Sequence, residues 1–151
     1  MATNEFGAYL VTQFVAAVIA GLLVRYVGGR EAHAIVASSG KMLVAEFIFT
    51  FALAWVVLHV ATARGTEGNS FYGLAIGFTV VAGAFAVGGI SGGAFNPAIA
   101  LGAMVTGLFE WSNIWIYLIA DFLGGAVAAF AFLFVLPAEK VTGDIEAAST
   151  A

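Results

Sequence analysis

Long apolar stretches alternate with short polar or glycine-rich segments along the 151 residues of this chain. A helix needs about 20 predominantly apolar residues to cross the hydrocarbon core of a bilayer, which is about 30 Å thick. Four stretches reach that length, at residues 8–27, 42–62, 71–90 and 113–136. The pattern therefore predicts an all-α membrane protein with four transmembrane helices.

The segment between the third and fourth stretches, residues 91–107, has a different pattern. It opens with Ser91-Gly92-Gly93-Ala94-Phe95, and such glycine-rich sequence forms helix poorly. Asn96 is a favoured N-cap, Pro97 suits the first helical position and Gly107 suits a helix end. A helix of about 11 residues is only about 16 Å long, so we expect a re-entrant loop and half-helix. Irregular backbone at membrane depth is tolerated only inside protein or beside a water-filled cavity, which predicts a pore or a polar cavity.

The first and last apolar stretches resemble each other. Tyrosine, leucine, a polar residue and phenylalanine recur in the same register, as Tyr9, Leu10, Gln13 and Phe14 and again as Tyr117, Leu118, Asp121 and Phe122. The similarity suggests a repeating unit of helix, helix, half-helix and helix. The chain would hold one whole unit, preceded by the last helix of another.

Composition places the chain in a lipid bilayer, because 62% of its residues are hydrophobic and only 9% are charged, against about 25% charged in soluble domains. The net charge is −4 and the five Lys and Arg residues are scattered, so no nucleic-acid partner is expected. Cysteine is absent, which excludes disulfides and zinc thiolate sites. With no nucleophile–base pair and no cluster of metal-ligating residues in the pattern, we expect neither an enzyme nor a bound metal or cofactor.

We expect one transmembrane domain over residues 1–137, because Pro137 cannot continue a helix. Residues 138–151 are rich in acidic and small residues and predict a flexible tail. The first seven residues contain no basic region, so no removable signal is expected and the first apolar stretch should stay in the membrane.

The residues Ser91-Gly92-Gly93-Ala94-Phe95-Asn96-Pro97-Ala98 resemble the pore loop, with its Asn-Pro-Ala motif, of the aquaporin and glycerol-facilitator, or major intrinsic protein, family. The stretch 43–51, which contains Glu46, resembles the helix that opens each half of that family, and the stretch 70–79 resembles its next helix. The motif alone is weak, but a motif that follows a Ser-Gly-Gly loop and a Glu within the membrane is specific. The resemblance runs from Tyr9 to Leu136 and matches the C-terminal half of a bacterial member plus the preceding helix.

The resemblance implies roles for individual residues. Asn96, Pro97 and Ala98 would form the pore motif, with the Asn96 amide donating a hydrogen bond to a passing water or polyol. The backbone carbonyls of Gly92, Gly93, Ala94 and Phe95 would form a ladder of acceptors. Glu46 would accept hydrogen bonds from backbone amides of the loop and brace it.

The selectivity filter of the family would fall on Ala84, Gly93 and Ile99. Water-specific members usually place His at the first of these positions and Arg at the last. Ala84 and Ile99 therefore imply a wider constriction without the main cation barrier. The permeant implied by the resemblance is water, a small neutral solute such as glycerol, or both.

Two acidic residues within apolar stretches leave a second function open, since charged residues there often mark proton pathways. Glu46 and Asp121 would serve a proton-coupled secondary transporter, with His59 as a distant candidate partner. Asp121 is otherwise expected to make a polar contact between helices or to be neutralised by protonation. A non-conducting membrane fragment is the third alternative.

A pore of this family needs two half-loops, and this chain contains one. The second half would come from a missing N-terminal half, from a partner chain, or from a second copy inserted in the opposite direction. The resemblance implies a homotetramer in the bacterial inner (plasma) membrane with both termini cytoplasmic. Cytoplasmic loops usually carry more Lys and Arg than the loops on the other side. The side of the termini would carry Arg64 and Lys140, whereas the opposite side would carry Arg25, Arg30 and Lys41. This count is slightly unfavourable to cytoplasmic termini.

Overall fold

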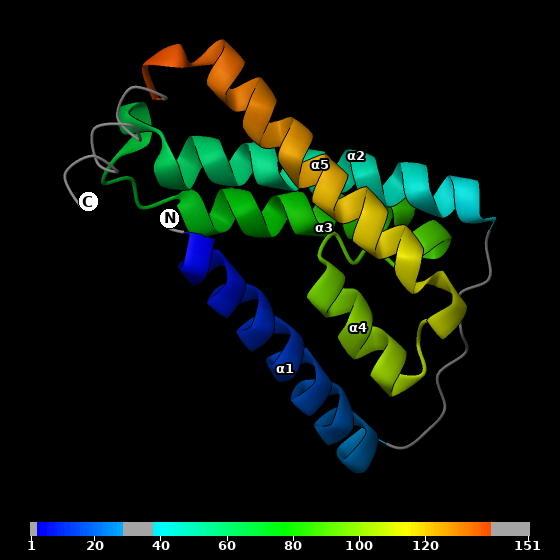
Figure 1. The fold of residues 1–151 in the computed structure, drawn as a ribbon. Helices are drawn as coiled ribbons and strands as arrows, with labels where there is room; N and C mark the ends of the chain where they lie inside the picture. The colour runs from blue at the N-terminus through cyan, green and yellow to red at the C-terminus, as the bar shows by residue number, and fades with distance from the viewer. Residues whose placement is uncertain (1–2, 29–37, 140–151) are drawn as a thin grey trace.

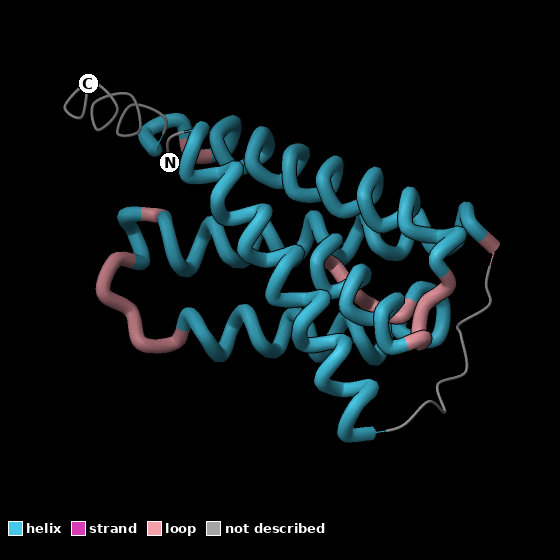
Figure 2. Tube along the Cα trace, turned by 60° about the horizontal axis from the view of Figure 1, so that its bottom comes forward, coloured by secondary structure: helices cyan, strands magenta, loops and turns pink. Residues whose placement is uncertain are grey.

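The computed structural model describes residues 3–28 and 38–139, and within these residues the chain forms helices and loops without a strand (Figure 2). The α-helices are α1 (Thr3–Gly28), α2 (Ser39–Val57), α3 (Tyr72–Ser91), α4 (Pro97–Thr106) and α5 (Ile114–Val135). A π-helical turn, Leu58–Thr62, extends α2, and 3-10 turns occupy Arg64–Thr66 and Trp111–Asn113. The predicted all-α class is confirmed.

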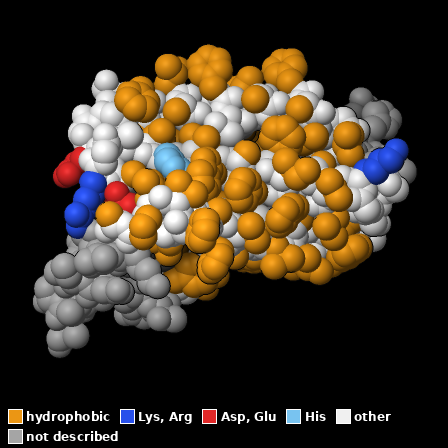
Figure 3. Space-filling model, turned by 90° about the horizontal axis from the view of Figure 1, so that it is seen from above, with side chains coloured by type: hydrophobic (Ala, Val, Ile, Leu, Met, Phe, Trp, Pro, Cys, Tyr) orange, Lys and Arg blue, Asp and Glu red, His pale blue; other side chains and the backbone are white. Residues whose placement is uncertain are grey.

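Within the described residues, four helical segments are long and apolar enough to cross a membrane, namely Glu5–Gly28, Ser39–Thr62, Tyr72–Ser91 and Trp111–Val135. The short helix α4 is apolar but has only 10 residues. Figure 3 shows a broad hydrophobic belt between two ends at which the charged side chains lie. This distribution matches a protein whose middle is solvated by lipid.

Helix α1 begins earlier than the apolar pattern predicted, at Thr3 rather than at residue 8. The polar residues at this end still form helix, and Glu5 lies in the first turn, where a negative charge interacts favourably with the helix dipole. The length of the apolar stretch therefore does not reveal this polar first turn of α1.

The helices form two groups (Figure 1). Helices α3 and α5 each pack on α2, while α1 lies beside α4 and contacts the rest mainly through it. The start of α1 and the end of α5 lie at the same end of the molecule. An even number of spans would produce that arrangement.

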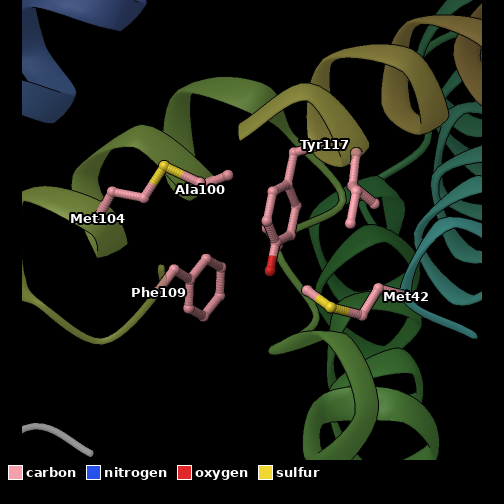
Figure 4. Close-up of a cluster of buried hydrophobic side chains, with 7 residues drawn as sticks. Met42, Ala100, Met104, Phe109 and Tyr117 are labelled. Atoms are coloured by element: carbon pink, nitrogen blue, oxygen red, sulfur yellow. The ribbon is translucent and has the colours of Figure 1, made fainter. Parts of the chain in front are cut away.

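A small core holds α4 against α5 and the start of α2. Its buried members are Met42, Ala94, Ala100, Met104, Phe109, Ile116 and Tyr117, and Figure 4 shows side chains from three helices and a loop gathered near the Tyr117 ring. Phe109 stacks on that ring, with centroids 5.1 Å apart. In contrast, Phe85 is 91% exposed on the outside, as expected where lipid is the solvent.

The end of α5 differs slightly from the prediction. Helix α5 ends at Val135, and residues 137–139 start a further helical turn. The Glu139 carboxylate accepts a hydrogen bond from the backbone N–H of Arg64 at 3.1 Å, so the first residues of the predicted tail are held in place. The rest of that tail, from residue 140, lies outside the described residues.

Candidate pore loop

The loop between α3 and α4 lies among the helices rather than at an end of the molecule (Figure 2). Gly92 caps α3 with a φ of 90°, and Gly93 follows with a φ of 66°. This left-handed backbone is accessible to glycine at little cost, which explains the Gly-Gly pair. Phe95, with a φ of 50°, is the one non-glycine residue with positive φ in the described chain.

The Phe95 side chain fills a tight space that offsets its unfavourable backbone conformation. Its ring lies 5.5 Å from the ring of Phe49, measured between centroids. A Cβ atom at Gly83 of α3 would lie only 2.5 Å from the Phe95 ring. Helices α2 and α3 therefore hold the residue that directly precedes Asn96.

Glu46 of α2 contacts the same loop through its carboxylate. The side chain is fully buried, and its two oxygens accept hydrogen bonds from the backbone N–H groups of Ala94, at 3.1 Å, and Phe95, at 2.7 Å. Hydrogen bonds to a carboxylate are stronger than those between neutral groups. The structure thus brings together the acid and the loop that the family resemblance paired.

A second attachment was missed by sequence reasoning. The Tyr117 hydroxyl of α5 donates a hydrogen bond to the Ser91 carbonyl at 2.5 Å, and the Ser91 Oγ atom accepts one from the Gly93 N–H at 3.3 Å. Both Tyr117 and Ser91 are completely buried. A tyrosine in the first turn of an apolar helix was the available signal, because a buried hydroxyl needs a partner.

Asn96 caps α4, and Pro97 occupies its first turn. The Asn96 Oδ1 atom accepts a hydrogen bond from the Ala98 N–H at 2.9 Å. Its Nδ2 atom lies 3.5 Å from the Oε1 atom of Gln13 in α1, at the outer limit of a hydrogen bond. The capping role uses the amide oxygen, so the amide N–H groups are not needed to cap the helix. Gln13 was not among the predicted site residues.

The loop also presents backbone acceptors. No described residue donates a hydrogen bond to the carbonyl oxygens of Gly92, Gly93, Ala94 or Phe95. These oxygens lie in the segment that leads directly to Asn96. A run of unused acceptors beside an amide donor can replace the hydration of a small polar molecule.

Two of the three predicted filter positions lie side by side, since a Cβ atom at Gly93 would be 3.4 Å from the Cα atom of Ala84. Ile99 is 57% exposed on α4. It lines a largely apolar groove of about 480 Å³ between α1 and α4, together with Gln13 and Asn96. Asn96, the predicted filter residue Ile99 and helix α1 therefore share one open groove.

The acidic residue Asp121 does not face this groove. It lies on α5 against α2, is 3% exposed, and its Oδ1 atom accepts a hydrogen bond from the Thr50 hydroxyl at 3.0 Å. The candidate relay partner His59 lies elsewhere, with its Nδ1 atom 2.9 Å from the Trp55 carbonyl and its ring against Phe132. Asp121 thus makes the contact between helices that was one of its two expected roles.

A short helix capped by Asn96 thus enters a bundle of apolar helices that are long enough to span a membrane. The family model described as "Major intrinsic protein" matches residues 2–132. The chain belongs to the major intrinsic protein family, as the pore-loop resemblance predicted.

Individual relatives agree with this assignment. "Aquaporin NIP1-4" of Oryza sativa subsp. japonica is 37% identical over 142 residues, which cover 91% of this chain and 50% of the relative. "Probable aquaporin TIP3-2" of Arabidopsis thaliana is 37% identical over 137 residues, with 85% and 50% covered. "Nodulin-26" of Glycine max is 34% identical over 139 residues, with 88% and 50% covered. The chain spans about half the length of the curated relatives it matches.

Proposed function

We propose that this chain is one half of a passive transmembrane pore for water, small neutral solutes such as glycerol, or both. The observation that carries the proposal is the placement of Asn96 at the start of a half-helix inside the bundle, after a loop held by Glu46. Irregular backbone of this kind is stable in a membrane where it lines a polar path.

In this proposal, the permeant exchanges its water contacts for contacts with the loop. The Asn96 amide donates a hydrogen bond to the oxygen of the permeant, and the carbonyls of Gly92 to Phe95 accept hydrogen bonds from its hydroxyl groups. The N-terminus of α4 carries a partial positive charge, which disfavours cations near the motif. Neutral polar molecules are therefore the permeants that this chemistry favours.

The filter positions support a permissive pore. Ala84 and Gly93 are small and adjacent, and Ile99 places an apolar side chain where a water-specific relative would place a cation. An apolar, wide constriction suits the carbon backbone of a polyol better than a narrow, charged one does. We propose that glycerol-sized solutes pass as well as water.

The second half of the pore has an identifiable place to dock. Helix α4 packs closely on α1, where a Cβ atom at Gly21 would lie 2.9 Å from the Gly102 carbonyl. In the repeat, Ala17 and Gly21 of α1 correspond to Gly125 and Ala129 of α5. Gly125 and Ala129 line an apolar groove of about 320 Å³. We propose that the half-helix of the second pore half docks there.

The repeat also indicates which kind of second half can complete the pore. Because α1 and α5 are equivalent in the repeat, α5 of one copy in an inverted pair would occupy the position on α4 where α1 of the other copy already packs. A distinct partner that supplies two helices and a half-helix avoids this overlap. We therefore favour an N-terminal half, covalently joined or separate, over self-association.

The membrane context follows the family. We propose a bacterial inner membrane, cytoplasmic termini and a tetramer with one pore in each two-half unit. The shared position of the start of α1 and the end of α5 supports termini on one side.

The test is stopped-flow light scattering of proteoliposomes that contain this chain together with a supplied first half of a family member. We expect water and glycerol permeability above that of empty vesicles and independent of any pH gradient. A flux that requires a pH gradient and disappears in Glu46→Gln would instead support the proton-coupled transporter, which the two buried acids Glu46 and Asp121 keep as a second candidate.

A further inference from the structure

Helix α5 is pressed against α2 at the turn that contains Asp121. A Cβ atom at Gly124 would lie 2.7 Å from the Phe47 carbonyl and 3.0 Å from the Phe51 backbone N. This close approach leaves Asp121 3% exposed, and Glu46, on the facing side of α2, is completely buried. Two carboxyl groups are therefore enclosed between the same pair of helices.

The hydrogen bonds of the two groups differ. Glu46 uses both oxygens as acceptors for the N–H groups of Ala94 and Phe95, which is the pattern of an ionised carboxylate. Asp121 accepts one hydrogen bond, from Thr50, and its Oδ2 atom is buried with no donor among the described residues. Glu46 lies one helical turn before Thr50 on α2, on the face of that helix that Asp121 contacts.

Two ionised carboxylates in contact would be costly at this position. Neither Glu46 nor Asp121 forms an ion pair within the described part of the chain, and burial of an unpaired charge costs several kcal/mol. A proton on Asp121 removes the second charge and turns its unpaired oxygen into a donor. Glu46, whose two oxygens accept hydrogen bonds from the loop, is the acceptor that this proton would reach.

We propose that Asp121 is a neutral carboxylic acid that donates a hydrogen bond to Glu46 and thereby positions the Glu46 carboxylate against the pore loop. The inference rests on the proposed function only in taking that loop as the lining of the pore. Asp121 is a positioning residue, because it acts on Asn96 and the permeant through Glu46 and the loop.

The repeat shows that this role is specific to α5. Gln13 holds the equivalent position on α1, yet its side chain reaches the cap residue Asn96. Asp121 turns instead toward Thr50 of α2. A polar residue in the same register thus contacts the cap of the half-helix in one unit and helix α2 in the other.

Infrared spectroscopy of the chain in lipid at neutral pH tests the protonation directly. We expect the C=O stretching band of a protonated carboxyl group, lost in Asp121→Asn and unchanged in Glu110→Gln, which removes an exposed acid. Absence of the band from the unmodified chain, or its persistence in Asp121→Asn, would overturn the proposal. This measurement needs no flux, so it stands even if the proposed pore function fails.

A second measurement separates a hydrogen-bond donor from a packing role. Asn at position 121 is a neutral donor of similar shape, whereas Val fills space without donating. In proteoliposomes with the supplied first half, we expect the permeability of Asp121→Val to be about tenfold lower than that of the unmodified chain. The permeability of Asp121→Asn should stay close to that of the unmodified chain. Equal losses in the two variants, with both proteins folded, would contradict the donor role.

Discussion

The Glu46 carboxylate lies 2.7 Å from the backbone nitrogen of Phe95, the residue that directly precedes Asn96. A side chain from the middle of α2 thereby fixes the backbone of a loop that follows 49 residues later. Since the loop also contains left-handed residues at Gly92, Gly93 and Phe95, it would not hold this path by its own preferences. The position of the Asn96 amide thus depends on α2.

Replacing Glu46 by Gln tests this dependence. An amide has one acceptor oxygen, so one of the two loop N–H groups would face an NH₂ group and remain unpaired. We expect a destabilisation of about 1–3 kcal/mol, measured by thermal unfolding in detergent, and a loss of permeability. Glu110→Gln, at an exposed position, is the matched control and should change neither quantity.

Two neighbouring glycines of α5 should respond differently to the same substitution. A Cβ atom at Gly124 would collide with the α2 backbone, whereas one at Gly125 would meet nothing within 4 Å. We expect Gly124→Ala to destabilise the chain by about 1–3 kcal/mol and Gly125→Ala to have little effect. Similar unfolding temperatures for the two variants would mean that α5 does not approach α2 as described.

The hydroxyl of Tyr117 provides a third test. Tyr117→Phe leaves the ring in the core but removes the donor to the Ser91 carbonyl, so we expect a loss of about 1–2 kcal/mol. The matched control is Tyr9→Phe, because Tyr9 holds the equivalent repeat position on α1 and is 62% exposed. Equal effects of the two substitutions on the unfolding temperature would argue against a buried hydrogen bond at Tyr117.

Ile99 tests the proposed selectivity. Ile99→Arg places a cation at the filter position where water-specific family members have one, next to the groove that Asn96 lines. We expect glycerol permeability to fall relative to water permeability, because the longer, charged side chain narrows the constriction and binds water. The ratio of the two permeabilities in the same vesicles is the measurement. An unchanged ratio would show that Ile99 does not face the permeant.

Apolar length and local helix signals predicted most of the fold. The four spans follow from stretches of about 20 apolar residues, and α4 follows from Asn96, Pro97 and Gly107, whose preferences act within one helix. The start of α1 was placed late, because its first turn is polar. Apolar length and capping residues therefore predicted which helices form better than they predicted where each helix begins or ends.

Contacts between distant segments were harder to predict from the residues. The family resemblance paired Glu46 with the loop, but nothing in the sequence placed the Tyr117 hydroxyl on Ser91 or Gln13 beside Asn96. The repeat made Gln13 and Asp121 equivalent, whereas in the structure one faces α4 and the other faces α2. Which way a polar side chain faces depends on how the helices pack, and an apolar sequence around it contains little information on that packing.

The central claim is that the Asn96 amide serves the permeant as well as capping α4. Asn96→Asp separates these roles, because Asp is an equally good N-cap but offers a negative charge in place of the amide donor. The decisive measurement is stopped-flow water and glycerol permeability of proteoliposomes holding this variant and the supplied first half. We predict normal unfolding temperature with permeability reduced by about tenfold or more, while permeability equal to that of the unmodified chain would contradict the account.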